Sequence, residues 1–172
     1  MAPTGARGVL RRLNFYYAWV LDILLTVSVA IIIVPVSLQI FARFTELLPR
    51  YIWTEELSRF LLVWMVMIGA MVGVREGTHF NVDLFPGLKG RTRAAADIVA
   101  GLFVLLFGAV FLWWGIEFTD FAWFRISELA ELPLWLIHIA WPIAGFTWIV
   151  FQGERMLDDL QILLHGEKDT TP

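Results

Sequence analysis

The sequence contains four long stretches that are almost free of charged residues. They run from about residue 18 to 42, 57 to 74, 98 to 118 and 133 to 151. A helix needs about 20 mostly apolar residues to cross roughly 30 Å of hydrocarbon, and each stretch meets or approaches that length. Backbone groups inside a bilayer have no water to bond, so helix is the expected conformation. The pattern predicts an all-α integral membrane protein of four transmembrane helices in a single membrane domain.

The composition supports lipid as the surroundings of the chain. Apolar residues make up 59% of the 172 residues and charged residues 17%, both far from the averages of soluble domains. Nine Trp and fourteen Phe suit helices that face acyl chains and anchor at headgroup level. Cysteine is absent, which excludes disulfides and thiolate sites for metals or haem. The formal net charge of −3 gives no reason to expect a nucleic-acid partner.

The basic residues predict the orientation in the membrane. Nine of the thirteen lie before the first stretch, between the second and third, or after the fourth: Arg7, Arg11, Arg12, Arg75, Lys89, Arg91, Arg93, Arg155 and Lys168. The other four belong to the opposite side: Arg43, Arg50, Arg59 and Arg125. Loops rich in Lys and Arg stay in the cytoplasm, so both termini are expected there. No small-residue cleavage site follows the first stretch, which is therefore expected to remain as an uncleaved helix.

The entry to the second stretch combines a cap with charged residues. Thr54 is expected to cap the helix, with Glu55 and Glu56 in the first turn, where a carboxylate favours the helix dipole. Arg59 lies four residues after Glu55 and three after Glu56, and it is expected to form a local ion pair with one of these carboxylates. Asp22, about one turn inside the first stretch, is expected to reach the interface or to pair with Arg11 or Arg12.

The segment between the third and fourth stretches has a helical pattern of its own. At 100° per residue, Phe121 and Leu129 fall on one face of residues 118–132, which predicts an amphipathic interfacial helix. Asp120, Glu128 and Glu131 make this outer segment acidic. They form a candidate docking face for a soluble partner, and a solvated linker explains the same charges equally well.

The tail after the fourth stretch predicts another amphipathic helix, at residues 152–165. Its apolar stripe consists of Met156, Leu157, Leu160, Leu163 and Leu164. Asp158 and Asp159 are expected to face away from that stripe. The stripe is expected either on the inner leaflet or against another subunit.

The sequence contains no pattern typical of an enzyme. His79, His138 and His165 fall at different depths, so a haem held by two of them is not expected. Nucleophile and base pairs, phosphate loops and broken mid-membrane helices are not evident. We therefore expect no catalytic residue, metal site or cofactor, and no transport site of the chain's own. Scaffolding of a larger membrane partner is the natural remaining role, and small residues such as Gly108 allow close helix contact.

Two motifs then connect the chain to a known family. The first is Trp53-Thr54-Glu55-Glu56-Leu57-Ser58-Arg59-Phe60, and the second runs from Gly69 to Asp83 and includes Arg75, His79 and Asp83. They resemble the Trp-x-Glu-Glu-x-x-Arg and Gly…Arg-x-Gly-x-His-x-x-Val-Asp stretches of the small membrane subunit of tripartite ATP-independent periplasmic (TRAP) transporters, the DctQ-like proteins. The resemblance covers nearly the whole chain.

The resemblance implies a function that composition does not show. Such a subunit joins a large membrane subunit in the bacterial inner membrane, and a periplasmic solute-binding protein delivers a carboxylate-bearing solute for sodium-driven uptake. The small subunit is then a fixed scaffold in contact with membrane lipid. Trp53, Glu55, Glu56 and Arg59 would organise the outer end of the second helix, and the Arg75 to Asp83 segment, with His79, would fix the inner end. An anchor subunit of a redox or other enzyme complex and a self-sufficient transporter remain as alternatives.

Overall fold

The computed structural model describes residues 6–45, 52–77 and 90–165. Within these ranges the helices are α1 (Ala6–Phe44), α2 (Ile52–Glu76), α3 (Arg91–Phe121), the short α4 (Trp135–His138) and α5 (Ala140–His165). Four helical segments of the described chain are long and apolar enough to cross a membrane, with α4 and α5 together forming the fourth. The prediction of an all-α protein with four membrane-spanning helices is confirmed. The longest helix, α1, has 39 residues.

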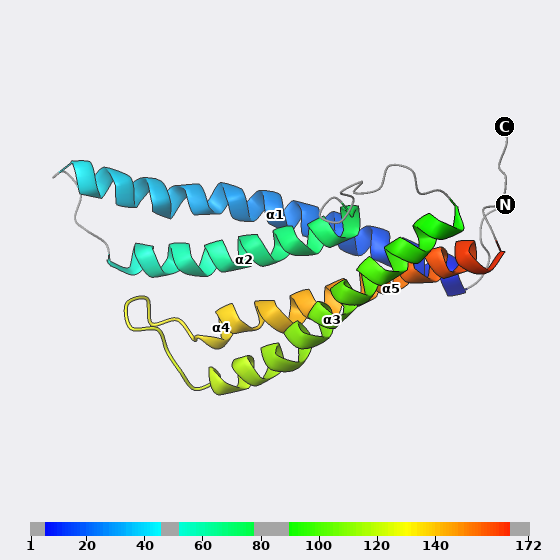
Figure 1. Ribbon diagram of the computed structural model, residues 1–172. Coiled ribbons are helices and arrows are strands. Elements are labelled where there is room, and N and C mark those ends of the chain that lie inside the picture. The colour runs from blue at the N-terminus through cyan, green and yellow to red at the C-terminus, as the bar shows by residue number, and fades with distance from the viewer. Residues whose placement is uncertain (1–5, 46–51, 78–89, 166–172) are drawn as a thin grey trace.

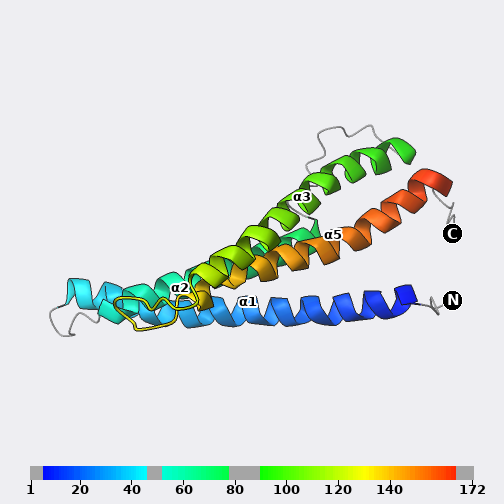
Figure 2. The ribbon, with the colours of Figure 1, turned by 90° about the horizontal axis from the view of Figure 1, so that it is seen from below.

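The helices form two antiparallel hairpins (Figure 1). One pairs α1 with α2, the other pairs α3 with α5, and α2 joins the two by packing on α5. The described part of the chain starts and finishes at the same end of the molecule, which we call the inner end after the predicted orientation; the opposite end is the outer end. Towards the inner end, α3 diverges from α1 (Figure 2).

Glycines allow α3 and α5 to approach closely. Gly101, Gly108 and Gly115 recur every seven residues on the face of α3 that meets α5. A Cβ atom on Gly145 of α5 would lie 2.6 Å from the carbonyl oxygen of Gly108. The two backbones therefore meet where any side chain would separate them, which is how small residues promote helix packing in membranes.

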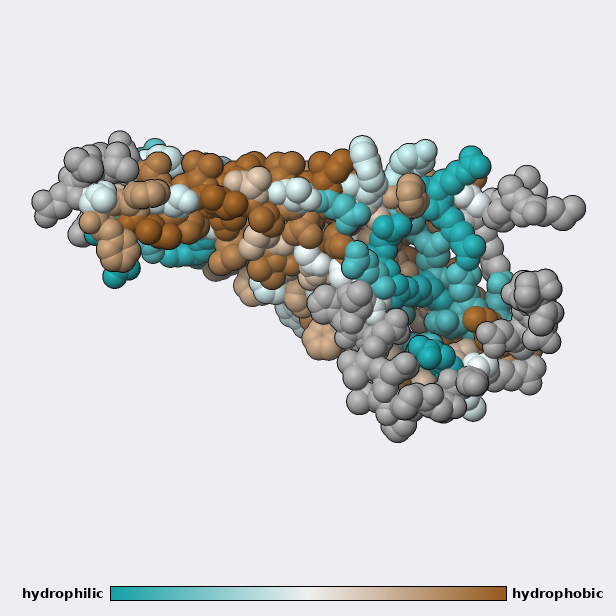
Figure 3. Space-filling model, turned by 90° about the horizontal axis from the view of Figure 1, so that it is seen from above, coloured by the Kyte–Doolittle hydropathy of each residue, from teal (hydrophilic) through white to brown (hydrophobic). Residues whose placement is uncertain are grey.

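The described chain buries little of its apolar surface. Met71, Ala140 and Ala144 are fully buried where α2 meets α5. By contrast, many large apolar side chains on the outside, such as Phe103 and Trp113, are more than half exposed. Figure 3 shows apolar side chains over most of the length and polar side chains gathered towards the inner end. Such a surface suits acyl chains or another membrane protein, since exposed apolar patches of this extent are rare on soluble monomers.

The predicted interfacial helix at 118–132 is wrong. α3 continues to Phe121, and Ile126 then pairs with Pro133 in an isolated antiparallel bridge. The Ser127 N–H donates to the Leu132 carbonyl at 2.8 Å, and Glu131 has a φ of 52°. A positive φ and a proline that lacks an N–H both suit a turn better than a helix. We call residues 122–134 the outer hairpin.

The predicted tail helix is present as the last part of α5, and it carries the predicted apolar stripe on its outer side. Asp158 and Asp159 are partly buried and line a cavity beside α3, whereas Leu157, Leu160 and Leu164 are exposed. Asp158 also pairs with Arg11 of α1 at 2.6 Å. Polar contacts within the chain, rather than the apolar stripe, therefore determine which face of this segment is turned inwards.

Candidate functional site

Glu56 connects the start of α2 to the outer hairpin. Its carboxylate Oε2 accepts hydrogen bonds from the backbone N–H groups of Leu129 at 2.8 Å and Ala130 at 2.7 Å. The Ser127 hydroxyl bonds the same carboxylate. A carboxylate that accepts several N–H bonds holds a turn strongly, because charged acceptors form stronger hydrogen bonds than neutral ones. Only 8% of Glu56 is exposed, so this contact is shielded from solvent.

The other charged residues of the first motif lie on the surface. Arg59 pairs with Glu55 at 3.3 Å, four residues earlier, and both side chains are more than half exposed. The predicted local ion pair is therefore confirmed for Glu55. The adjacent Glu56 instead faces the outer hairpin. Trp53 is 47% exposed, so it is available at the outer end for lipid or a partner.

Gln39 joins α1 to α2 at the same end. Its amide N–H groups donate to the Thr54 carbonyl at 2.9 Å and to the Ser58 hydroxyl at 2.7 Å. α2 begins at Ile52, so Thr54 lies within the first turn and is not the cap that was predicted. Sequence reasoning treated Gln39 only as an interruption of an apolar stretch. A lone polar residue near the outer end of an apolar stretch was the signal that could have identified this contact.

The candidate docking residues lie around the outer hairpin and are exposed. Asp120 is in the last turn of α3, and Glu128 and Glu131 flank the two residues held by Glu56. The Arg125 guanidinium lies over the Phe121 ring at 3.9 Å from its centroid. Glu56 therefore determines the position of the segment that presents two of the three acidic side chains.

At the inner end, Arg75 contacts two other helices. Its carbonyl accepts a hydrogen bond from the Arg155 guanidinium of α5, and its own guanidinium lies 5.7 Å from the centroid of the Phe15 ring on α1. Gly77 has a φ of 71° and its N–H donates to the Gly73 carbonyl at 3.1 Å, which ends α2. A Cβ atom at Gly77 would lie 2.8 Å from Arg155 Nη2. His79 and Asp83, the other candidates of the second motif, lie outside the described residues.

Comparison with known proteins identifies the family of the chain. The family model for the DctQ component of tripartite ATP-independent periplasmic transporters matches residues 32–162. The chain belongs to the DctQ family. It is 33% identical over 102 residues to the C4-dicarboxylate TRAP transporter small permease protein DctQ of Rhodobacter capsulatus, covering 55% of this chain and 43% of that protein.

Two further relatives extend the comparison. The sialic acid TRAP transporter small permease protein SiaQ of Vibrio cholerae is 24% identical over 115 residues, 66% of each chain. The isethionate TRAP transporter permease protein DctMQ of Oleidesulfovibrio alaskensis is 25% identical over 124 residues, 69% of this chain and 19% of that protein. This DctQ-family chain therefore matches less than half of the length of the Rhodobacter relative and about a fifth of the Oleidesulfovibrio one. The family consists of transporter subunits and is not a known class of enzyme.

In this DctQ-family chain, a row of polar side chains also connects α1 to α5. Arg11 lies 3.5 Å from Glu154 and 2.6 Å from Asp158, Asn14 donates to Glu154, and Tyr17 Oη is 2.7 Å from Thr147 Oγ1. The α1 members are spaced by three residues, so they share one helix face. That spacing was a signal in the sequence, but it was not used to predict a contact. Asp22 is exposed, and no ion pair in the described structure joins it to Arg11 or Arg12.

The described residues offer no group of side chains for metal binding. No cluster of three or more His, Asp or Glu side chains placed to hold a metal occurs among them. His138 Nδ1 is 2.8 Å from the Leu134 carbonyl, and its ring stacks with Phe118. The described residues of the two motifs arrange helices and present a surface.

Proposed function

We propose that this chain is the fixed scaffold subunit of a TRAP transporter, beside a large membrane subunit that carries the transport site. In this proposal a periplasmic solute-binding protein delivers a carboxylate-bearing solute, and a sodium gradient drives uptake. The chain spans the bacterial inner membrane, with both termini in the cytoplasm. The family match favours this role over the alternative, a membrane anchor of a redox or other enzyme complex.

One structural observation carries the scaffold role: the two hairpins are joined by polar contacts at both ends. Glu56 holds the outer hairpin at the outer end. At the inner end, Arg155 bonds the end of α2, and Arg11 pairs with Glu154 and Asp158. Helices joined at both ends resist moving apart, which suits a subunit that stays still while another moves.

The distribution of charge supports the absence of a transport site in this chain. Asp22, Arg59, Glu117 and His138 are the ionisable residues inside the four predicted spans, and each lies near one end of its span. Ion and substrate sites of secondary transporters lie near the middle of the bilayer and use broken helices. The central part of each span in this chain is apolar, so we assign the transport site to the partner subunit.

A cross-linking experiment tests whether the scaffold is fixed. The chain has no cysteine, so Asn14→Cys with Glu154→Cys places one reactive pair between α1 and α5, where the native side chains bond each other. A short bifunctional methanethiosulfonate reagent, which links the two thiols through disulfides that a reductant cleaves, is applied to the complex in proteoliposomes. Each single-cysteine variant serves as a control for modification. We expect uptake to continue after cross-linking. Loss of uptake that a reductant reverses would mean that α1 and α5 must separate during transport.

Reconstitution tests the division of roles. Proteoliposomes receive this chain, a large TRAP membrane subunit and a binding protein from the same organism. Uptake of a C4-dicarboxylate, sialic acid and isethionate is then measured with and without a sodium gradient. The proposal expects uptake of a carboxylate-bearing solute only with all three proteins and the gradient. Uptake by this chain alone would overturn the scaffold role, and sodium-independent uptake would overturn the coupling.

The acidic outer face offers a test of docking. If the binding protein docks there, Glu128→Gln with Glu131→Gln should raise the concentration of binding protein needed for half-maximal uptake, and added salt should reduce the difference between variant and native complex. Glu117→Gln, an exposed acidic residue in α3 outside the hairpin, serves as the control. An unchanged half-maximal concentration would assign these residues to a solvated linker.

A further inference from the structure

A polar cavity lies at the inner end of the chain, and Gly77 is the one residue of its described lining that belongs to the motifs that resemble the family. It has a volume of about 410 Å³, within the roughly 300–1,000 Å³ typical of small-molecule sites. Its polar lining comes from α3 and α5: Arg93, Asp97, Gln152, Arg155, Asp158 and Asp159. Ala100, Gly101 and Val104 form an apolar wall on α3, and Gly77 closes the end next to α2.

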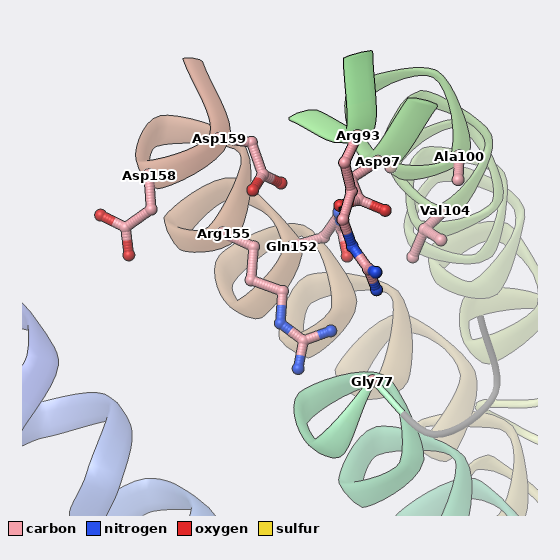
Figure 4. Close-up of a pocket in the computed structure, with 10 residues that line it drawn as sticks. Gly77, Arg93, Asp97, Ala100, Val104, Gln152, Arg155, Asp158 and Asp159 are labelled. Carbon is pink, nitrogen blue, oxygen red and sulfur yellow. The ribbon is translucent and has the colours of Figure 1, made fainter. Parts of the chain in front are cut away.

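Gln152 shows that the cavity is equipped for a ligand. Only 7% of this residue is exposed, and its side chain makes no hydrogen bond to another residue in the described parts of the chain. The amide atoms of Gln152 border the cavity, where water or a ligand can bond them, and polar groups in protein interiors nearly always have such a partner. Because Gln152 lines the cavity, a molecule in the cavity is placed to supply the missing bonds (Figure 4).

The charges around the cavity call for a ligand with two opposite charges. Asp159 lies near Asp97 and Asp158, and its carboxylate forms no ion pair within the described residues. Asp158 is turned towards α1, where Arg11 pairs with it. Asp97 is paired with Arg93, so Asp159, which has Arg155 near it, is the carboxylate that a primary ammonium group would reach with directed hydrogen bonds.

Two guanidinium groups supply the opposite charge. Arg155 uses one N–H to bond the Arg75 carbonyl, which leaves further donors directed at the cavity. Arg93 forms a salt bridge with Asp97 at 3.8 Å and lines the same cavity. Arginine suits phosphate because its planar donors match the phosphate oxygens.

The position of the cavity indicates where such a ligand comes from. Gly77 follows the last residue of α2, Arg93 and Asp97 are in the first two turns of α3, and residues 152–159 lie beyond the predicted span of α5. These groups therefore belong to the headgroup level of the inner leaflet, and Val104 leads from them into the apolar region. We propose that the cavity binds the headgroup of a phospholipid that carries both a phosphate and a primary ammonium group.

Lipid competition tests this proposal. The full-length chain, in the complex in which it purifies, is stripped of lipid, and rebinding of phosphatidylethanolamine, phosphatidylcholine and phosphatidylglycerol is counted by native mass spectrometry. Phosphatidylcholine has no N–H donor and phosphatidylglycerol has no cation, so we expect phosphatidylethanolamine to bind about tenfold more tightly than either, the equivalent of one charge-assisted hydrogen bond. Equal binding of the three lipids would overturn the proposal.

Variants show whether this preference belongs to the cavity. Asp159→Asn should abolish the preference for phosphatidylethanolamine over phosphatidylglycerol, whereas Glu76→Gln, which removes an exposed carboxylate at the same end, should leave it intact. If Asp159→Asn does not yield folded complex, Gln152→Leu removes the buried amide with little change in volume and should weaken the same lipid. A preference that survives in a folded cavity variant would assign the lipid to another surface.

Soluble phosphoethanolamine distinguishes the two sources of this headgroup chemistry. If it fails to displace the bound phospholipid at millimolar concentration, the acyl chains contribute to binding and the ligand is a membrane lipid. If phosphoethanolamine binds the native lipid-free complex but not the Asp159→Asn variant, the cavity recognises the phosphate and ammonium groups as proposed. The ligand is then a soluble phosphate ester with an ammonium group.

Discussion

The Glu56 carboxylate near the start of α2 accepts a hydrogen bond from the backbone N–H of Ala130, 74 residues further along the chain, at 2.7 Å. The same oxygen also accepts the Leu129 N–H. One side chain of the first hairpin thus determines the position of the loop that connects α3 to α4. Because the two groups are far apart in the sequence, this contact forms only when both hairpins are in place.

Replacing Glu56 should release the outer hairpin. Glu56→Ala leaves two backbone N–H groups without their acceptor, which is unfavourable where water is largely excluded. We expect trypsin to cleave after the exposed Arg125 several-fold faster than in the native chain, measured as the appearance of a fragment beginning at Ile126. Glu55→Ala is the matched control and should leave the cleavage rate unchanged, since the Glu55 side chain is exposed and pairs with Arg59 of its own helix. Equal cleavage in both variants would show that Glu56 does not hold the hairpin.

The Glu55–Arg59 pair should contribute little to folding. Both side chains are more than half exposed, and such pairs are worth less than about 1 kcal/mol. Arg59→Ala is therefore expected to leave the midpoint of SDS-induced unfolding almost unchanged. If the same variant impairs uptake, Arg59 acts through a partner at the outer surface. A large fall in the midpoint would instead make the residue structural.

Gly77 and Gly153 can both be replaced by Ala, but the added methyl group is crowded at Gly77 and has open space at Gly153. Gly77→Ala places a side chain at a φ of 71° beside the Arg155 guanidinium, and backbone strain of this kind costs about 1–3 kcal/mol. A Cβ atom at Gly153 meets nothing within 4 Å, so Gly153→Ala should be neutral or stabilise its helix by about 0.5–1 kcal/mol. SDS unfolding of the two variants, compared with the native chain, checks both signs. Similar results for the two would contradict the contact between Arg155 and the end of α2.

The contact between α3 and α5 should be intolerant of even one methyl group. A Cβ atom at Gly145 would lie 2.5 Å from the backbone nitrogen of Leu112, so Gly145→Ala forces two backbones apart and should cost about 1–3 kcal/mol. Gly69→Ala is the comparison, because its nearest neighbour is a flexible Leu25 methyl group at 3.7 Å. The difference in SDS unfolding midpoint measures how tightly the α3–α5 hairpin is packed. No difference would mean that the helices adjust freely.

The four spans could be predicted from the sequence because lipid permits few alternatives. Long apolar stretches in a bilayer must be helices, and α1, α2, α3 and α5 each contain the expected stretch. The Glu55–Arg59 pair is equally local, being set by helix spacing alone. The role of Glu56 was missed because its partners lie between Ser127 and Ala130, about 70 residues away, and no local pattern links them.

The two amphipathic segments show where periodicity is insufficient. Phe121 and Leu129 fit one helical face, but Phe121 ends α3 and Leu129 lies in the hairpin held by Glu56. In the tail the helix and its outward apolar stripe were predicted, whereas the ion pair between Arg11 and Asp158 was not. Both segments make a contact with a charged side chain distant in the sequence, which periodicity does not reveal.

The length of α1 makes bilayer thickness a variable for this subunit. At 1.5 Å per residue its 39 residues extend roughly 58 Å, almost twice the hydrocarbon layer. The helix can fit by leaning, by projecting into the aqueous phase, or by both, and a change in acyl-chain length alters the balance between them. Because α2 packs along α1 and also packs on α5, a tilt of α1 also tilts the other helices. Membranes of different thickness would therefore hold the same subunit at different angles and present its partner with a differently inclined surface.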